Sequence, residues 1–259
     1  MPDNSHASAG SGGILLRRLA RICYKVGDRL RKFGPPGEVW IDVGAHLGEL
    51  TFHSARSNPS LTVYAFEPNW KLAVQRMGVL RNFVVLPMAI AEEDGCANFY
   101  INNHDESSSL LSLDPAGVRD WVGGDALREY QTIVVPTTRL DTFLNRAGIA
   151  RVAYLKVDAQ GADLAVVRSA GERLSDIDRI TLEVAVAPRQ LYLGAARKED
   201  VMRYMAEQNF VLTSAETQTH GQEENLTFVR QVQKPLLASA QNPISAHHIP
   251  DRGRDIVDS

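Results

Sequence analysis

Residues 38–57 read EVWIDVGAHLGELTFHSARS. The apolar segment EVWIDVG at 38–44 predicts a buried β-strand, and HLGELTFHSARS at 46–57 predicts a helix that follows it directly. Gly44 and Gly48 lie at the junction, where the missing Cβ lets the backbone approach a ligand closely. The start of the helix adds backbone N–H groups that have no partner within the helix. This stretch therefore predicts the ligand-binding edge of an α/β fold.

The rest of the chain continues the alternation of strands and helices. Further strands are expected at 61–68, 83–90, 151–161 and 177–186, and helices at 69–82, 140–149, 162–175 and 198–209. The last two strands, 210–216 and 224–231, are expected to form an antiparallel pair. Repeated strand–helix–strand units favour a parallel arrangement. The pattern predicts a Rossmann-like α/β fold with a mostly parallel seven-stranded sheet and helices on both faces.

One segment departs from this alternation. Residues 96–138 carry two strand-like stretches, at 96–103 and 131–140, and no helix of the repeating kind stands between the third strand and these. We interpret the segment as a β-hairpin-like insertion over the carboxyl edge of the sheet. Together with the N-terminal helix it is expected to form a substrate lid, in which Trp121 and Tyr130 present flat aromatic faces.

Composition limits the kind of protein. The chain has 259 residues, a net charge of -3 and two cysteines. A slightly acidic chain is not expected to bind nucleic acid, and two unrelated cysteines fit a reducing cytoplasm. We expect no signal peptide and no membrane span.

The two ends are expected to lie outside the catalytic domain, which we place at 38–231. Residues 1–13 are rich in small polar residues and are expected to be disordered. Residues 14–37 are expected to form a basic amphipathic helix, which is the candidate contact surface for a homodimer. Residues 232–259 lack periodicity and are expected to form a mobile tail.

Two acidic residues lie near the carboxyl ends of the two predicted strands that border the glycine turn. Asp42 comes two residues before Gly44, and Glu67 closes the strand 61–68, just before Pro68. The turn is neither the dinucleotide G-x-G-x-x-G nor a P-loop with its lysine. Asp42 is suited to accept hydrogen bonds from an ammonium group. A carboxylate placed like Glu67 can bind both hydroxyls of a ribose. A ligand with ammonium, sulfonium and ribose groups is S-adenosylmethionine.

The chain resembles the FkbM-type family of S-adenosylmethionine-dependent methyltransferases. The matching stretches are IDVGAHLGELT (41–51), YAFEPN (64–69), MAIAEEDG (88–95), SSSL (107–110), RLDTFL (139–144), YLKVDAQGADLAVVRSAGERL (154–174) and ITLEV (180–184). The resemblance implies a class I methyltransferase fold and O-methylation of a hydroxyl on a sugar or natural product. One departure is Ala162-Asp163, where a bulkier residue and Glu are common in the family.

The resemblance also implies which residues bind the cofactor. It places Asp42, Gly44, Ala45, His46, Gly48, Glu67, Pro68, Met88 and Ala89 at the cofactor. Met88 and Ala89 would lie beside adenine, although core packing explains Met88 equally well. His46 would either cover the methionine part of the cofactor or cap the following helix.

Asp158 is the principal catalytic candidate. It ends the strand 151–161, and the carboxyl ends of parallel strands face the ligand crevice. We expect Asp158 to act as general base or to bind Mg²⁺ that acidifies the acceptor hydroxyl. Glu183, near the end of ITLEV, would join it as base or metal ligand. The two carboxylates are equally suited to hold substrate hydroxyls by hydrogen bonds. His104 in the insertion is the alternative base.

Other functions remain open at this stage. An N-methyltransferase of small molecules is disfavoured, because Val157-Asp158-Ala159-Gln160 stands where many amino methyltransferases carry Asn/Asp-Pro-Pro-Tyr. A Rossmann-type NAD-dependent oxidoreductase is disfavoured by the absent glycine fingerprint. A non-enzymatic binding module is disfavoured because Asp42 and Glu67 are both present.

Overall fold

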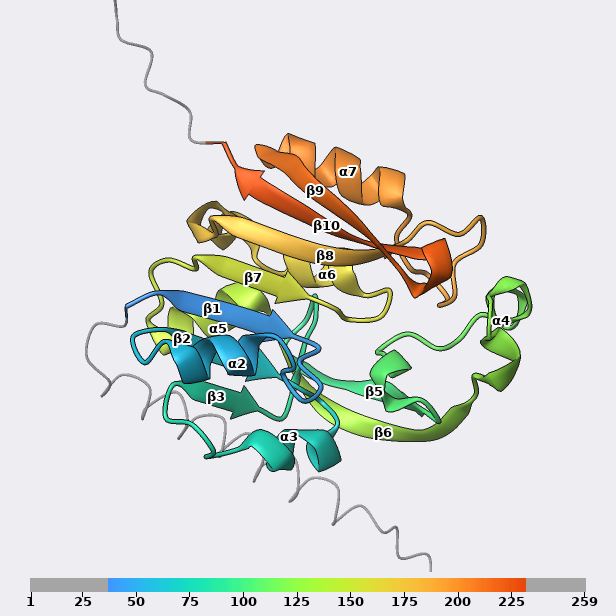
Figure 1. The fold of residues 1–259 in the computed structure, drawn as a ribbon, viewed down its shortest axis with the longest axis horizontal. Helices are drawn as coiled ribbons and strands as arrows, with labels where there is room; N and C mark the ends of the chain where they lie inside the picture. The colour runs from blue at the N-terminus through green and yellow to red at the C-terminus, as the bar shows by residue number, and fades with distance from the viewer. Residues whose placement is uncertain (1–36, 232–259) are drawn as a thin grey trace, which may run out of the picture.

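The computed structural model describes residues 37–231. The expectations for 1–13, for 14–37 apart from its last residue, and for 232–259 lie outside the described residues. The described chain forms a central sheet in the order β3-β2-β1-β7-β8-β10-β9 (Figure 1). Its strands are β1 (Val39–Val43), β2 (Thr62–Phe66), β3 (Phe83–Leu86), β7 (Tyr154–Val157), β8 (Arg179–Ala185), β9 (Phe210–Gln218) and β10 (Glu223–Arg230).

The sheet is parallel except at one edge. The strands β3, β2, β1, β7 and β8 pair in parallel. Only β10 runs antiparallel, to both β8 and β9. The mostly parallel seven-stranded sheet and the antiparallel final pair are therefore as predicted. The strand order reverses between β1 and β7. Open α/β sheets bind ligands at such a reversal, in the crevice at the carboxyl ends of the strands, so we expect the site at the ends of β1 and β7.

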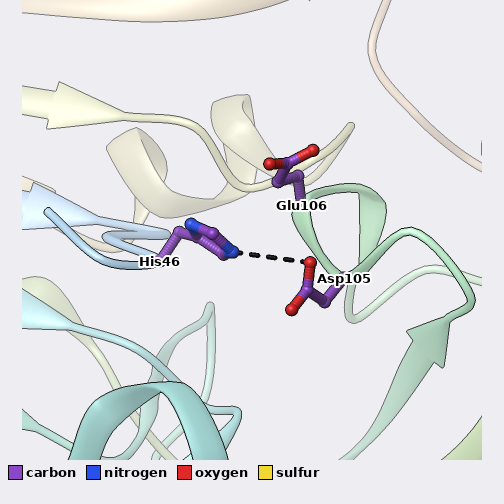
Figure 2. A group of neighbouring side chains, drawn as sticks. All are labelled: His46, Asp105 and Glu106. Atoms are coloured by element: carbon purple, nitrogen blue, oxygen red, sulfur yellow. Dashed lines mark ion pairs between the residues drawn. The ribbon is translucent and has the colours of Figure 1, made fainter. Parts of the chain in front are cut away.

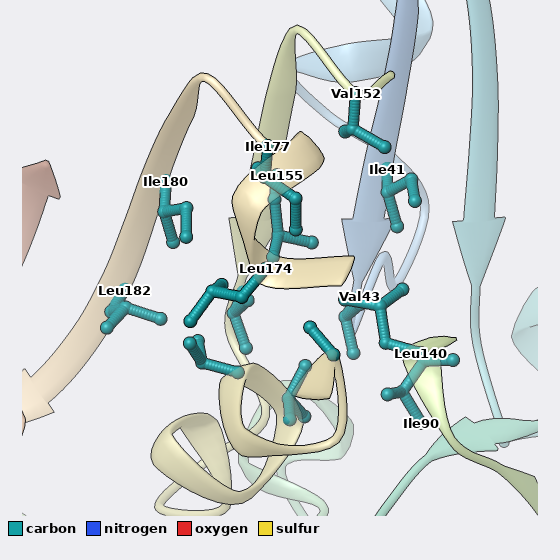
Figure 3. Packing of buried hydrophobic residues seen from close by; sticks show 14 of the residues in the cluster. Ile41, Val43, Ile90, Leu140, Val152, Leu155, Leu174, Ile177, Ile180 and Leu182 are labelled. Atoms are coloured by element: carbon teal, nitrogen blue, oxygen red, sulfur yellow. The ribbon is translucent and has the colours of Figure 1, made fainter. Parts of the chain in front are cut away.

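Helices cover both faces of the sheet. One face packs against α5 (Leu140–Ala147), α6 (Asp163–Arg168) and α7 (Lys198–Glu207), and the other packs against α2 (Thr51–Ser57). Alternate residues of a strand supply the two cores. In β2, for example, Tyr64 and Phe66 belong to the first core, whereas Val63 and Ala65 belong to the second. Figure 3 shows the first core, where Ile41 and Val43 of β1 meet Leu155 of β7 and Leu174.

The helix expected at 46–57 begins only at Thr51. Positive φ angles at Gly44, His46 and Gly48 keep residues 44–50 in an irregular turn. The helix expected at 69–82 is α3 (Trp70–Arg76), capped by the Asn69 side chain, which accepts a hydrogen bond from the backbone N–H of Lys71. The helix expected at 162–175 divides into α6 and the 3₁₀ helix η3 (Gly171–Asp176), because Gly171 has a φ of 51°.

The strand expected at 83–90 also divides. It leaves the central sheet after Leu86, and β4 (Ala89–Ile90) joins a second sheet in the order β4-β6-β5. The two long strands of this sheet, β5 (Gly95–Asn102) and β6 (Glu129–Thr138), pair antiparallel, as the hairpin-like insertion predicts. Between them lie η1 (Asp105–Ser107), α4 (Pro115–Asp120) and η2 (Gly124–Ala126). The insertion extends beyond the carboxyl ends of β1 and β3 (Figure 1). The remaining short helix, η4 (Thr219–Gly221), joins β9 to β10.

Candidate active site

The carboxyl ends of β1, β2 and β7 and the insertion surround a cavity of about 210 Å³. Of the residues predicted from the sequence, those that line it are Gly44, His46, Glu67, Pro68, Ala89 and Asp158. Five carboxylates line the cavity, from Glu49, Glu67, Asp105, Glu106 and Asp158, against the side chains of Lys156 and His46. This excess of acidic groups suits a ligand that carries positive charge.

Gly44 lets two strand ends approach each other. Its φ is 70°, and a Cβ atom at this position would lie 1.8 Å from the carbonyl oxygen of Asp158. The backbone N–H groups of Gly44 and Ala45 both donate to the carbonyl oxygen of Phe66, at 3.1 and 3.0 Å. The turn is therefore tied to β2 on one side and lies against β7 on the other. Only glycine fits here without moving the backbone.

Glu67 connects the end of β2 to the glycine turn. Its Oε2 accepts a hydrogen bond from the backbone N–H of His46 at 2.8 Å, and its Oε1 accepts one from that of Asn69 at 2.7 Å. Burial raises the pKa of Glu67 to about 7, against the lowering effect of these two hydrogen bonds. Each carboxylate oxygen retains a lone pair. Glu67 is thus held rigidly at the cavity wall and can accept hydrogen bonds from ribose hydroxyls.

Asp42 differs from the prediction. It does not line the cavity. Its Oδ2 accepts a hydrogen bond from the hydroxyl of Thr51, and its Oδ1 lies 3.4 Å from Nζ of Lys156. Asp42 thus supports the turn from behind, and the geometry does not place it against the ammonium of a cofactor.

Three other predicted cofactor residues also lie outside the cavity lining. Ala45 packs in the core beneath α2, and Met88 packs in the main core, the alternative that the sequence left open. Gly48, with a φ of 66°, faces Phe83 of β3, where a Cβ atom would lie 2.7 Å from the ring. These residues shape the turn and its support.

Asp158 lies in a network of polar side chains at the end of β7. The amide nitrogen of Gln160 donates to Oδ1 of Asp158 and to Oε2 of Glu183, both at 2.8 Å. The hydroxyl of Tyr192 lies 2.8 Å from the amide oxygen of Gln160 and 2.7 Å from the carbonyl oxygen of Ser107. The amide of Gln160 therefore orients Asp158 and links it to Glu183.

The same network does not fit a divalent cation between Asp158 and Glu183. An oxygen of each carboxyl group is directed at the amide hydrogens of Gln160. Burial, together with the charges of Asp158 and Glu223, raises the pKa of Glu183 to about 10. A metal-bound carboxylate must be deprotonated, and the raised pKa of Glu183 opposes this. The predicted Mg²⁺ site therefore has no support in the geometry.

Lys156 is a site residue that sequence reasoning missed. Its Nζ lies 3.4 Å from Oδ1 of Asp42 and 3.5 Å from Oδ2 of Asp158, and its side chain lines the cavity. Burial lowers the pKa of Lys156, but the two carboxylates outweigh that effect and raise it. The available signal was a lysine inside an otherwise apolar strand, two residues before a predicted catalytic carboxylate.

The insertion contributes different residues from those predicted. His104 is exposed and does not line the cavity, whereas the adjacent Asp105 and Glu106 do. Trp121 is buried in a cluster with Leu191 and Tyr192. Tyr130 is exposed, and neither aromatic residue lines the cavity. The insertion therefore faces the cavity through Asp105, Glu106 and Phe99, and not through the two aromatic residues expected from the sequence.

The fold and the cavity together define a class of protein. A strand order that reverses at β1, a glycine turn after β1 and a carboxylate after β2 are the features of a Rossmann-like nucleoside-binding enzyme. Residues 42–212, well over half of the chain, match the family model described as the methyltransferase FkbM domain. The chain belongs to this family and is an S-adenosylmethionine-dependent methyltransferase.

Two relatives are similar over most of their length. The 2-O-methyltransferase NoeI of Sinorhizobium fredii is 27% identical, and the match covers 61% of this chain and 67% of NoeI. The 31-O-demethyl-FK506 methyltransferase FkbM of Streptomyces tacrolimicus is 28% identical, over 70% of this chain and 76% of the relative. A similar solved structure is TrmK of M. capricolum with S-adenosylhomocysteine, at 8% identity and a TM-score of 0.41, covering 79% of this chain and 67% of TrmK.

The part of the chain that the structure describes has no helix long and apolar enough to span a membrane.

Proposed function

We propose that the protein is an O-methyltransferase that acts on a hydroxyl of a sugar or of a natural product such as a polyketide or glycoside. The observation that carries this proposal is the position of Asp158, an oriented carboxylate at the wall of the same cavity as Glu67. Of the two relatives described above, one is named as a 2-O-methyltransferase and the other as a methyltransferase of 31-O-demethyl-FK506, which supports a hydroxyl as the acceptor. The catalytic domain would comprise residues 38–231.

In this proposal, separate residues bind the cofactor and accept the proton. The turn at Gly44 and the Glu67 carboxylate hold S-adenosylmethionine, which supplies an electrophilic methyl group. Asp158 accepts the proton of the acceptor hydroxyl while the oxygen forms its bond to the methyl carbon and the carbon–sulfur bond breaks. General-base catalysis contributes about 10²–10⁴-fold, and alignment of the two reactants contributes more. His104 does not line the cavity, and the raised pKa of Glu183 favours its protonated form.

The proposal excludes a divalent ion from the reaction because the amide of Gln160 is directed at both Asp158 and Glu183. Family membership sets aside the NAD-dependent oxidoreductase. The N-methyltransferase is tested by including amines among the acceptors. The cytoplasmic location, the absence of nucleic-acid partners and the homodimer stay predictions.

The test is a methyl-transfer assay with labelled S-adenosylmethionine over glycosides, macrolide-like alcohols and amines, with magnesium or with EDTA. Transfer to a hydroxyl should occur equally in both conditions. Asp158→Asn should lower turnover by about 10²-fold or more while S-adenosylhomocysteine still binds in calorimetry. The matched control is Asp178→Asn, because Asp178 pairs with the exposed Arg151 and does not line the cavity. Near-normal turnover by the Asp158 variant would refute the assignment of the base.

A further inference from the structure

The insertion contacts the cofactor turn directly. Asp105 and Glu106 of η1 line the same cavity as His46 of the glycine turn. Figure 2 shows the His46 ring directed toward Asp105, with Glu106 alongside. Segments that are far apart in the chain therefore meet at the cavity through side chains. The contact between η1 and His46 ties the insertion to the glycine turn.

His46 is the junction between the insertion and the ribose-facing carboxylate. Its backbone N–H donates to Oε2 of Glu67 at 2.8 Å, and its Nδ1 lies 2.8 Å from Oε1 of Glu49. Its φ of 47° is unusual for a residue with a side chain. The position of the His46 ring is therefore coupled to the backbone group that holds Glu67.

The other ring nitrogen of His46 lacks a hydrogen bond. Nε2 is buried and has no hydrogen-bond partner among the described residues. It lies 3.5 Å from Oδ1 of Asp105, which is close enough for an ion pair but longer than a good hydrogen bond. A buried donor left without an acceptor is unfavourable. A movement of less than about 1 Å by η1 would complete the hydrogen bond between His46 and Asp105.

The charges around His46 favour a donor at both ring nitrogens. Burial lowers the pKa of His46, but Glu49, Asp105 and Glu67 together raise it overall. The groups that face the ring from the surrounding elements are Glu49 of the turn, Glu67 after β2, and Asp105 and Glu106 of η1, with Lys156 of β7 lining the same cavity. The protonated ring can donate to Glu49 and to Asp105 at the same time.

We propose that Asp105 is a positioning residue that closes the insertion over the bound cofactor by pairing with His46 and thereby fixing the turn that holds Glu67. This inference rests on the proposed function only in that the cavity binds S-adenosylmethionine. Asp105 is half exposed, whereas His46 is mostly buried and pairs with Glu49. We therefore assign the movement that completes the pair to η1, and this closure would slow the departure of the cofactor.

A divalent cation held by His46, Asp105 and Glu106 is the competing explanation. Their donor atoms lie within 4.8 Å of one another, but both carboxylates are exposed. The ion pair accounts for His46 and Asp105 without a metal, and it gives Glu106 no part. This difference between two adjacent acidic residues makes the two explanations separable by experiment.

The test measures the dissociation rate of S-adenosylhomocysteine by stopped flow for the full chain and its variants. Asp105→Ala should raise the rate about tenfold, the effect of losing one charge-assisted contact. The control Asp125→Ala, at an exposed residue of the insertion that does not line the cavity, should stay within about twofold of the parent. Glu106→Ala should raise the rate less than Asp105→Ala, because its removal leaves no buried donor without a partner. Asp105→Asn, which keeps an acceptor oxygen, should give an intermediate rate. Circular dichroism verifies that each variant is folded.

The pH dependence supplies a readout that a purely structural role would not move. The pairing is complete while His46 is protonated and is lost as the pH rises through its pKa. Dissociation from the parent protein should therefore accelerate with rising pH, and this acceleration should be smaller in Asp105→Ala. Glu67, whose pKa is raised to about 7, titrates in both proteins. The readout is therefore the difference between the two proteins in the pH dependence of the dissociation rate.

Three results would overturn the inference. Equal rates for Asp105→Ala and Glu106→Ala would remove the specific role of Asp105. A rate that changes on addition of EDTA or Mn²⁺, with both variants equally impaired, would show that the cluster binds a cation. If the parent protein does not bind S-adenosylhomocysteine at all, the proposed function fails as well, and calorimetry identifies that case separately.

Discussion

Asp42 and Lys156 face each other across β1 and β7, with Oδ1 of Asp42 3.4 Å from Nζ of Lys156. They are register partners in the parallel pairing of these strands. Their side chains therefore leave the sheet on the same face. Only 2% of the Asp42 side chain and 23% of the Lys156 side chain is exposed. The carboxylate that supports the glycine turn is thus balanced by a lysine that also contacts the predicted base, Asp158.

This pairing predicts a large asymmetry between single and double substitutions. Lys156→Met should lower the free energy of unfolding by about 3 kcal/mol, because it leaves the buried Asp42 carboxylate without its cation. Asp42→Asn in combination with Lys156→Met should restore most of that loss. Urea unfolding of the four proteins of this double-mutant cycle provides the measurement.

The control for that cycle is Lys198→Met, which breaks the more exposed ion pair with Glu224. It should cost about 1 kcal/mol or less. If the double variant is no more stable than Lys156→Met, the two charges are not energetically coupled.

Gly44 provides a second prediction, about the approach of the turn to β7. Gly44→Ala should lower the free energy of unfolding by about 4 kcal/mol or more, because the added Cβ would meet the carbonyl oxygen of Asp158 at 1.8 Å. Gly78→Ala is the matched control, since Gly78 has a φ of 73° and nothing within 4 Å of its Cβ position. This control should show the cost of the left-handed backbone alone, about 1–2 kcal/mol. Thermal unfolding of both variants compares the two, and similar losses would mean that the backbone near Asp158 relaxes easily.

The fold could be predicted from the sequence because apolar periodicity identifies elements one at a time. The strands around Ile41 and Leu155 are largely buried and show as short apolar runs, each with one charged residue. Element ends were less accurate. The helix start at Thr51 depends on the φ angles of His46 and Gly48, and a histidine in the left-handed region leaves no clear trace in a single sequence.

The candidate site was predicted in part for the same reason. Glu67 and Asp158 follow strands whose carboxyl ends share one edge, so that topology alone brings them to the cavity. The partnership of Asp42 with Lys156 and that of Asp105 with His46 depend on register and on the path of the insertion. These are long-range properties, and no local pattern specifies which of several acidic residues will face a given cation.

Glu183 gives the last prediction, which concerns stability as a function of pH. Burial and the neighbouring Asp158 raise the pKa of Glu183 to about 10, well above the ordinary value for glutamate. For a group whose pKa is raised on folding, the stabilisation is complete below the unfolded-state pKa and is lost as the pH rises toward the folded-state pKa. Between about pH 5 and pH 8 the parent protein should therefore lose stability relative to Glu183→Gln, which mimics the protonated side chain and has no proton to release.

The difference in the free energy of unfolding between these two proteins should grow by at most about 1.4 kcal/mol per pH unit. Urea titrations at about pH 5, 6, 7 and 8 measure it, with the exposed Glu93→Gln as the control that should follow the parent. The Glu183 variant should also keep its methyl-transfer activity, because its amide oxygen can still accept the hydrogen bond that Gln160 now donates to Glu183. Parallel stability curves would mean that Glu183 is ionised in the folded protein. The better explanation of the Asp158–Glu183 pair would then be that it binds a metal ion, or that Glu183 is a second base beside Asp158.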